Sequence, residues 1–431
     1  MSGNLSPAAA SEVGAEIETP APVSPVRRPR IAILHQGYIP HYRVRFFELL
    51  NRLGGAEYVV FHGAPPAETG SRRVEGPFAF PECWVDNREF RIGPWTAIYQ
   101  PALRAVLGGG YDAVVLGHEI KFVSNLALAL LCPWRGIAVL YWGFGYHVKA
   151  GFGLSGEAEG WAAAAAIRIK KFFARRADGY LAYTRRGAAE LAAIGFPPER
   201  TFILQNTIDI AEQCAVHEAV RDIDPQAIRA ELGLRPDSVV FAQIGRLIEW
   251  KRVDLLIEAV RRINRDGAVP SIEALIIGGG PLEAELKALA RDVPGVHFLG
   301  ALPTPPDTQV ARCMKIAAAV VIPGGVGLAI NHAFAQGRPL ITRAHDLHGP
   351  EIEYLAHDEN GLLVPGDFDE FTATLARFAA APEWQARLAA GALRSRDELR
   401  LETMAERFDA AVRATVARGR KAAGVQLRES R

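Results

Sequence analysis

The chain has 431 residues, of which 49% are hydrophobic and 23% are charged, and its formal net charge at pH 7 is +1. This profile is typical of a globular protein and excludes a disordered chain or a strongly basic nucleic-acid binder. The length fits two domains of about 200 residues each. We therefore expect two domains with a cleft between them, and no nucleic-acid partner.

Cysteine usage and the N-terminal segment bear on location. Cys83, Cys132, Cys214 and Cys313 are far apart and form no CxxC pair or Cys/His cluster, so we expect neither disulfides nor zinc. Residues 1–28 are rich in Ala, Ser, Pro and Glu and lack the pattern of a signal peptide, and we predict a disordered tail. No apolar run reaches the roughly 18 to 20 residues of a spanning helix. The expected location is cytoplasmic.

After this tail, short apolar runs alternate with helical patterns. The pairs are RIAIL with HYRVRFFELLNRL, YDAVVLG with FVSNLALALL, GIAVLYWG with AAAAAIRIKKFFARRA, and DGYLAYT with RRGAAELAAIG. Continuous apolar strands separated by amphipathic helices predict a parallel sheet that is covered on both faces. We assign residues 29–215 to this first α/β domain.

The alternation stops in a polar stretch with one short helical pattern, DPQAIRAEL, and we assign residues 216–235 as a linker. It then restarts with VVFAQIG, VDLLIEAVRRI, IEALIIGGG, LEAELKALA, VHFLG and AAAVVIPGG. This pattern predicts a second doubly wound domain over residues 236–395. The end of the chain is helical in pattern without a further strand, and residues 396–431 are assigned as C-terminal helices.

In open parallel sheets, ligands bind where the strands end and helix N-termini converge. The stretch GRLIEWKRVDLL ends a strand at Gly245 and starts a helix near Trp250, which puts Arg246 at the mouth of the strand and Lys251 in the first helical turn. Cations near a helix N-terminus oppose its dipole, and a bound anion would offset this. Arg246 offers a bidentate fork to a phosphate and Lys251 a point charge. Two solvated surface cations are the alternative.

Two further strand-to-helix turns contain glycines. IIGGGPLEAEL has such a turn, which alone is weak support for nucleotide binding because glycine also serves tight turns. The stretch VVIPGGVGLAINHAFAQGRPLI has another, in which backbone N–H groups could approach a phosphate closely. The turn consists of Gly324, Gly325, Val326 and Gly327. In the helix that follows, His332 lies off the apolar stripe, so it is either a ligand contact or a histidine satisfied within the domain.

These motifs, in this order, resemble glycosyltransferase family 4, also called glycosyltransferase group 1, whose members have the two-domain GT-B fold. The resemblance rests on GRLIEWKRVDLLIEA, IIGGGPLEAEL, VHFLG, PGGVGLAINHAFAQGRPLI and PEIEYLAHDENGLLV, and covers nearly the whole second domain. The first domain is similar in outline through HQGYIPHYRVRFFELL, RRADGYLAYTRRGAAEL and ILQNTID, which resemble polysaccharide-type members. The resemblance implies two Rossmann-like domains that face a cleft, with C-terminal helices that cross back to the first domain.

The resemblance also implies a site. The second domain would hold a nucleotide diphosphate sugar, with Arg246 and Lys251 on the diphosphate, and substrate contacts from Gly245, from residues 324–327 and from Glu351. No metal or other cofactor is expected, because cationic side chains and the helix N-terminus would stabilise the leaving diphosphate. The acceptor would be a glycan or a lipid-linked glycan on the first domain, and the transfer would be retaining.

The sequence departs from the family in two places. Relatives have two glutamates eight positions apart, where this chain has Gly324 and His332. A neutral histidine can hydrogen-bond ribose hydroxyls, so altered donor recognition is favoured over lost activity. Many members also have a histidine after the strand that here reads YWGFG. The candidates to replace it are His147 and His118, and the alternative is that both are ordinary loop residues.

The helical segment Ile167–Arg176 has basic residues along one side with Ile and Phe beside them. Such a stripe can dock on anionic lipid headgroups, or it can be the solvated side of a packed helix. We therefore expect a cytoplasmic protein and hypothesise peripheral contact with the inner face of the membrane.

The functional prediction is a glycosyltransferase that acts in surface polysaccharide assembly. Two alternatives remain open: a nucleotide-sugar epimerase, for which no acid/base pair is identified in the sequence, and a non-catalytic relative that binds nucleotide or glycan.

Overall fold

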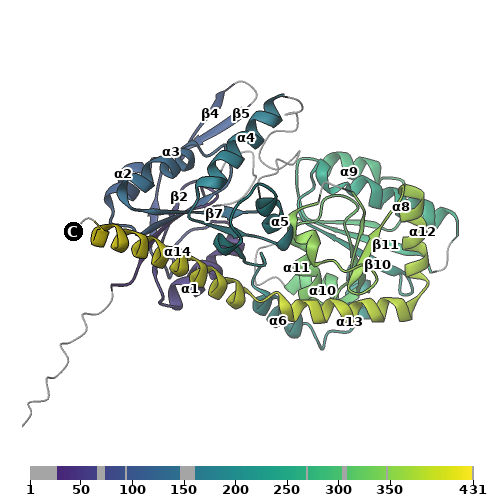
Figure 1. The fold of residues 1–431 in the computed structure, drawn as a ribbon. Helices are drawn as coiled ribbons and strands as arrows, with labels where there is room; N and C mark the ends of the chain where they lie inside the picture. Colours follow the sequence, from purple (N-terminus) through teal and green to yellow (C-terminus); the bar gives the residue numbers. More distant parts are fainter. Residues whose placement is uncertain are drawn as a thin grey trace, which may run out of the picture.

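The computed structural model describes residues 27–65, 73–92, 95–145, 161–267, 270–302, 308–345 and 348–429. Most of the predicted N-terminal tail lies outside these residues. Two parallel β-sheets, each covered by helices on both faces, lie at opposite ends of an elongated molecule (Figure 1). The prediction of an α/β fold with two doubly wound domains is confirmed.

The first sheet has seven strands in the order β3-β2-β1-β6-β7-β8-β9, and all neighbours are parallel. Its central strands are buried apolar runs, as expected for a sheet between two layers of helices. The strands are β1 (Arg30–Leu34), β2 (Glu57–His62), β3 (Glu82–Trp84), β6 (Ala113–Gly117), β7 (Ala138–Gly143), β8 (Gly179–Ala182) and β9 (Thr201–Ile203).

Helices pack on both faces of this sheet. One face is covered by α2 (Leu103–Gly108), α3 (Val123–Leu131), α4 (Trp161–Arg176) and α5 (Arg185–Ala193). The short 3₁₀ helices η2 (Cys132–Arg135) and η3 (Pro198–Arg200) lead into β7 and β9. The other face is covered by α1 (His41–Arg52) and by the last helix of the chain, α14 (Leu401–Glu429).

The second sheet has six parallel strands in the order β12-β11-β10-β13-β14-β15. The strands are β10 (Val239–Ile244), β11 (Ile272–Ile277), β12 (Val296–Gly300), β13 (Ala317–Val321), β14 (Leu340–Arg343) and β15 (Gly361–Val364). One face is covered by α8 (Val253–Arg265), α9 (Glu283–Leu289) and α12 (Phe368–Ala379). The other is covered by α7 (Pro225–Glu231), α10 (Thr308–Ile316) and α11 (Ala329–Ala335), and α13 (Pro382–Glu398) contributes to both cores.

The C-terminal helices cross between the domains as the resemblance implied. Helix α13 lies along the second domain, and α14 then runs back along the first (Figure 1). Met404, Phe408 and Val412 of α14 are fully or almost fully buried in the core formed with α1 and the first sheet. The last helix is therefore a structural part of the first domain.

Two regions differ from the simple alternating pattern. Helix α6 (Ile210–Ala219), which the predicted boundaries divide between the first domain and the linker, packs against α10 and α11 of the second domain. The boundaries themselves stay a prediction. Between β3 and α2, β4 (Arg88–Ile92) and β5 (Trp95–Tyr99) pair as an antiparallel hairpin, which the sequence pattern did not indicate.

Candidate functional site

Each of the two sheets has one topological switch point. Strand order reverses direction between β1 and β6 in the first sheet and between β10 and β13 in the second. Ligands of open α/β sheets bind at the carboxyl ends of such strand pairs. In the second domain, the segments that follow β10 and β13 are those with the predicted cations and the predicted glycine turn. The topology thus brings these two motifs side by side.

The segment after β10 differs in detail from the prediction. Lys251 does not lie in the first turn of an α-helix but at the end of a 3₁₀ turn, η4 (Glu249–Lys251). Arg252 follows with a left-handed backbone (φ 50°), and α8 begins only at Val253. The Arg246 side chain is exposed beyond the end of β10, and in the described part of the chain its guanidinium has no hydrogen bond or ion pair.

Lys251 is only 7% exposed. Its Nζ donates a hydrogen bond to the Gly325 carbonyl oxygen at 2.8 Å and lies 4.5 Å from the centroid of the Trp250 ring. Burial lowers the pKa of Lys251 to about 8, and the Glu351 carboxylate partly opposes this effect. An ammonium group has three donors, so a buried Lys251 with one such bond has capacity for an anionic ligand.

The glycine turn is more closed than the sequence suggests. The amides of Gly324 and Gly325 donate to the carbonyl oxygens of Lys251 (3.1 Å) and Trp250 (2.8 Å). The Val326 amide donates to Nδ1 of His348 at 3.1 Å. In this structure these three amides are thus bonded within the protein instead of being free for a phosphate, while Gly327 and Leu328 have no amide partner among the described residues.

Close contact with Trp250 explains why the turn contains glycine. A Cβ atom on Gly324 would lie 2.3 Å from the Trp250 carbonyl oxygen, and a Cβ on Gly325 would lie 1.8 Å from Cε2 of the Trp250 ring. Both separations are far below van der Waals contact. The position where relatives have their first glutamate cannot hold any side chain in this backbone arrangement.

His332 faces the first domain. It lines a pocket of about 390 Å³ together with residues of α1, among them His41 and Tyr42, and with the segment 208–213. Its Nδ1 lies 3.4 Å from Oε1 of Gln213. Burial and the nearby His41 lower the pKa of His332 to about 4, so at neutral pH it is an uncharged donor and acceptor. Both domains thus form this pocket.

Of the two histidines proposed to replace the missing family histidine, the structure describes only His118. His118 is buried in the first domain, where its ring nitrogens lie 2.9 Å from the Tyr180 hydroxyl and 3.1 Å from the Lys170 carbonyl oxygen. Burial lowers its pKa to about 3. It is a satisfied core histidine. His147 lies outside the described residues.

Glu351 lies beside the glycine turn and is only 4% exposed. Its Oε1 accepts a hydrogen bond from Nδ2 of Asn206 at 2.5 Å, and Asn206 Oδ1 accepts one from the Arg43 guanidinium. Burial raises the pKa of Glu351, while the Asn206 hydrogen bond and the charges of Arg43 and Lys251 oppose this rise. A carboxylate of the second domain is therefore linked to a cation of the first.

Sequence reasoning missed Arg43 and Asn206. Arg43 is 1% exposed and lies on the same helix stripe as Phe46, Phe47 and Leu50, which are the buried residues of α1. An arginine on an otherwise apolar stripe must find partners inside the protein. The helical spacing of Arg43 from Phe46, Phe47 and Leu50 could therefore have indicated a buried functional cation. Asn206 follows β9 at the crossing between the domains and gave no comparable signal.

An aromatic cluster lines the first-domain side. The ring of His35, just after β1, stacks on Trp142 with centroids 3.9 Å apart, and its Nε2 lies 3.0 Å from the Tyr183 hydroxyl. Burial and the charge of Arg43 hold the pKa of His35 well below its ordinary value. This neutral, largely buried cluster packs against Arg43, whose guanidinium lies 5.1 Å from the centroid of the Trp142 ring.

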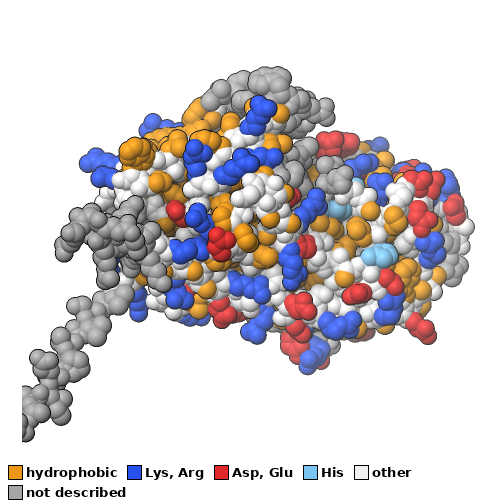
Figure 2. Space-filling model, viewed as in Figure 1, with side chains coloured by type: hydrophobic (Ala, Val, Ile, Leu, Met, Phe, Trp, Pro, Cys, Tyr) orange, Lys and Arg blue, Asp and Glu red, His pale blue; other side chains and the backbone are white. Residues whose placement is uncertain are grey.

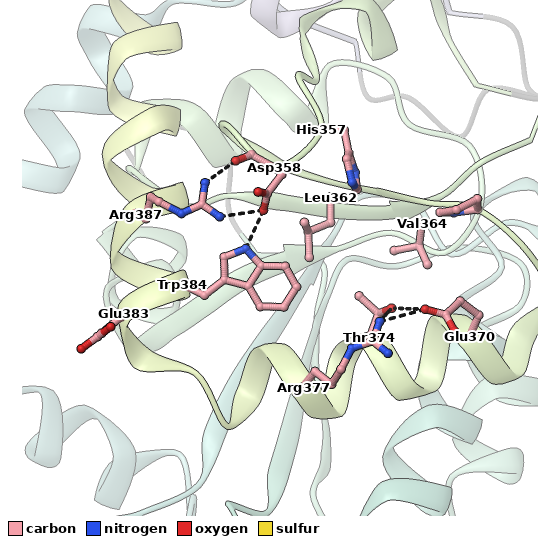
Figure 3. Close-up of a pocket in the computed structure, with 11 residues that line it drawn as sticks. His357, Asp358, Leu362, Val364, Glu370, Thr374, Arg377, Glu383, Trp384 and Arg387 are labelled. Carbon is pink, nitrogen blue, oxygen red and sulfur yellow. Dashed lines mark hydrogen bonds and ion pairs between the residues drawn. The ribbon is translucent and has the colours of Figure 1, made fainter.

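A second hollow, of about 780 Å³, lies away from these residues between β15, α12 and α13 (Figure 3). Asp358 accepts hydrogen bonds from Trp384 and Arg387, and Glu370 pairs with Arg377. Since these charges are already paired and no predicted site residue lies there, we do not assign it a ligand.

The described part of the chain contains no group of three or more side chains that could hold a metal ion. Within the same residues, no helix is long and apolar enough to cross a membrane.

Comparison with known proteins identifies the two domains. Residues 42–207 match the family model "Glycosyl transferase 4-like domain", and residues 238–380 match "Glycosyl transferases group 1". A D-inositol 3-phosphate glycosyltransferase of Frankia alni is 31% identical over 207 residues, which are 46% of this chain and 48% of that protein. The chain thus matches about half the length of this curated relative.

Solved structures share the fold over most of the chain. Anabaena Alr3699/HepE in complex with UDP has a TM-score of 0.64 at 17% identity and covers 90% of this chain and 100% of its own. A putative UDP-N-acetylglucosamine 2-epimerase of Listeria monocytogenes has a TM-score of 0.56 at 14% identity, covering 90% and 96%. Fold, motif order and both family models agree, and the chain belongs to the group 1 glycosyltransferases.

Proposed function

We propose that the protein transfers a sugar from a nucleotide diphosphate sugar to an acceptor bound against the first domain. The observation that supports this most directly is the arrangement of Arg246 and Lys251. Both follow the central strand β10 at a topological switch point, one exposed and one buried against the glycine turn. Among Arg43, Lys251 and Glu351, the buried charges sum to +1, and a diphosphate would supply the missing negative charge.

The proposed chemistry follows from where charge develops. As the bond between the anomeric carbon and the phosphate breaks, negative charge gathers on the diphosphate and the sugar becomes oxocarbenium-like. Arg246 and the protonated Lys251 would stabilise this charge in the cleft. In retaining transfer, the leaving phosphate oxygen can accept the proton of the acceptor hydroxyl on the same side, so the proposal requires no protein base.

The comparisons suggest which substrates to test first. The UDP complex of the Anabaena protein makes UDP-sugars the first donors to try. The relatives named D-inositol 3-phosphate glycosyltransferase make inositol phosphate one candidate acceptor. A glycan or lipid-linked glycan of surface polysaccharide assembly is the other, and both stay proposals. No metal or cofactor is part of the proposed reaction.

A thermal-shift screen against UDP, GDP and dTDP and their sugars tests the donor site. We expect at least one nucleotide to stabilise the wild type and Arg246→Ala to weaken that response, because the substitution removes a phosphate contact. Arg52→Ala, an exposed arginine on α1, is the control. No stabilisation by any nucleotide, or an unchanged response in Arg246→Ala, would overturn the phosphate site.

Product analysis with the same sugars separates the alternatives. Transfer or hydrolysis supports the glycosyltransferase. Interconversion of the free nucleotide sugars would instead identify an epimerase, an activity for which a protein of the same fold is named. Binding without turnover would identify a non-catalytic relative, which the closed glycine turn and the lost glutamates would then explain.

Peripheral membrane contact remains part of the proposal, now with a defined face. Helices α2, α3, η2 and α4 contain no Asp or Glu, although the whole chain is nearly neutral. Hydrophobic side chains and Lys or Arg intermingle over α2–α4 (Figure 2). Trp134 of η2 is 88% exposed, and the other large exposed hydrophobic residues of this face are Leu130, Leu131, Ile169 and Phe172. Helices that have exposed apolar and basic side chains but no acidic ones suit an anionic bilayer.

Vesicle flotation tests this contact. We expect the wild type to float with vesicles of anionic phospholipid and less with neutral ones, and less at high salt because exposed charges are screened. Trp134→Ser and Arg175→Glu should both reduce flotation. Leu289→Ser, an exposed apolar residue of α9 in the second domain, is the matched control. Absence of flotation with anionic vesicles would exclude this contact.

A further inference from the structure

Three charged side chains are buried at the boundary between the domains. Arg43 of the first domain is 1% exposed, and Lys251 and Glu351 of the second are 7% and 4% exposed. Each buried charge is costly unless a partner compensates it. With two cations and one carboxylate, Glu351 is the group through which both cations can be stabilised.

A chain of hydrogen bonds joins Arg43 to Glu351. The Arg43 guanidinium donates to Oδ1 of Asn206 and, at 3.3 Å, to the Thr207 carbonyl oxygen. Asn206 Nδ2 then donates to Oε1 of Glu351 at 2.5 Å. Because Asn206 uses its amide oxygen toward Arg43, it presents its NH₂ group to Glu351, which favours the ionised carboxylate.

Glu351 and the segment of Lys251 lie around the same turn. A Cβ atom on Gly327 would be 3.9 Å from Glu351 Oε2 and 3.9 Å from Cη2 of Trp250, the residue before Lys251. In this low-polarity setting an ionised Glu351 favours the protonated Lys251, whereas burial alone favours the neutral amine.

The other titratable groups near Glu351 do not compete for this role. Burial raises the pKa of Tyr42, and it also raises those of Tyr183 and Tyr354 far above neutrality, so all three stay uncharged. His35, which contacts Tyr183, is held neutral by burial and by Arg43. Arg43 and Lys251 are therefore the cations that act on this carboxylate.

We propose that Arg43 is a positioning residue for the phosphate site: acting through Asn206, it holds Glu351 as a carboxylate, and that carboxylate keeps Lys251 charged. The first domain then sets the charge of a phosphate-binding group of the second. This inference rests on the proposed function, in which Lys251 binds the diphosphate.

The test is the pH dependence of UDP affinity, measured by calorimetry between pH 7 and about 8.5, where the diphosphate no longer titrates because its last pKa is about 6 and the uracil ring still keeps its N3 proton. Wild-type affinity should fall as pH rises through about 8, since Lys251 loses its proton there. Arg43→Met and Asn206→Leu should move this fall to lower pH by about one unit. Arg52→Met, an exposed arginine on the same helix, should leave it in place.

A second background shows whether the effect acts through Lys251. Arginine stays charged throughout this range, so Lys251→Arg should flatten the profile, and adding Arg43→Met should then cause no shift. An unchanged midpoint in both Arg43→Met and Asn206→Leu overturns the inference, and so does a shift that persists with Lys251→Arg. If Arg43→Met fails to fold, the pH midpoint of UDP affinity in Asn206→Leu alone tests the inference. Wild-type protein that binds no UDP, GDP or dTDP would instead overturn the proposed function.

Discussion

Trp250 determines which side chains the neighbouring glycine turn can carry. Its carbonyl oxygen accepts the Gly325 amide, and its ring occupies the space where a Gly325 side chain would lie. A larger residue at position 324 or 325 must therefore displace the segment that holds Lys251. The backbone of Trp250 and Lys251 excludes a side chain at position 324, and the Trp250 ring excludes one at position 325.

This close packing predicts that a glutamate cannot be placed at position 324 without a loss of stability. Gly324→Glu should destabilise the protein, because its Cβ would lie 2.3 Å from the Trp250 carbonyl oxygen, and overpacking of this kind typically costs about 1–3 kcal/mol. Thermal unfolding measures the change. Gly327→Ala is the control, since its Cβ would meet its nearest neighbours at 3.9 Å. A Gly324→Glu protein as stable as wild type would contradict the closed turn.

His332 should make stability depend on pH in the acid range. Its pKa is about 4 in the folded protein and near 6.5 when unfolded, so between these values the unfolded chain binds the extra proton. Stability should therefore fall as pH drops from about 6.5 to 4, by up to ~3 kcal/mol from this group.

Urea unfolding of wild type and His332→Gln at a series of pH values isolates this contribution. The stability of wild type relative to His332→Gln should fall by up to ~3 kcal/mol as pH drops from about 6.5 to 4. His357→Gln, at an exposed histidine, is the control. If it changes the pH dependence of stability as much as His332→Gln does, the effect does not come from the burial of His332.

Arg246, Lys251 and the glycine turn could be located from the sequence, because their positions follow from where the strands end and from the residue types there. The hydrogen bonds of the turn could not, since they depend on how η4 packs against residues 323–327. Similarly, the sequence placed His118 after a strand, but only packing against Tyr180 and α4 shows that it is satisfied in the core.

At the scale of elements, a short 3₁₀ helix joins the two domains. Glu353 of η5 (Pro350–Tyr354) accepts hydrogen bonds from the amides of Arg185 and Arg186 at 3.0 and 2.7 Å, which are the first residues of α5. These amides have no partner within their own helix, and the carboxylate also complements the helix dipole. A residue of the second domain thus completes the N-terminus of a first-domain helix.

Glu353→Gln should weaken this contact by about 1 kcal/mol, because it removes the charge and one of the two acceptor oxygens. Urea unfolding at pH 7 gives the free energy. Glu359→Gln, at an exposed glutamate nearby in sequence, should have little effect. Equal stability of Glu353→Gln and wild type would mean that the contact does not hold the domains together in solution.

Most elements followed from periodicity because apolar strands and amphipathic helices alternate regularly. The exceptions are elements with weak patterns. In the β4–β5 hairpin, β4 (REFRI) has three charged residues among five, and β5 makes one bridge outside the hairpin, between Ile98 and Phe122. Helix α6 has no marked apolar side, so its packing against the second domain depends on the crossing of the chain at residues 207–209 and not on its own sequence.

At the scale of the whole molecule, α14 holds the first domain together. Phe408 is fully buried and its ring lies 5.1 to 5.9 Å from those of Trp142, Phe46 and Tyr58. Phe408→Ala should cost about 3–5 kcal/mol, the usual range for a buried phenylalanine. Glu406→Ala, exposed on the same helix, should stay within about 0.5 kcal/mol of wild type. Denaturant unfolding compares them, and a small effect of Phe408→Ala would contradict the packing of α14.

The crossing of α14 also orders events during synthesis. All strands of the first sheet are complete once Ile203 has been made, yet its core needs residues up to Val416. At about 5–20 residues per second, the ribosome takes ~10–40 s to make the roughly 210 residues between them. In that interval the second sheet can form with all its own strands, while Phe46 and Trp142 stay uncovered on the first. The domain that is translated first is therefore the last to be finished, and the nascent chain presents a site for chaperones until its final helix leaves the ribosome.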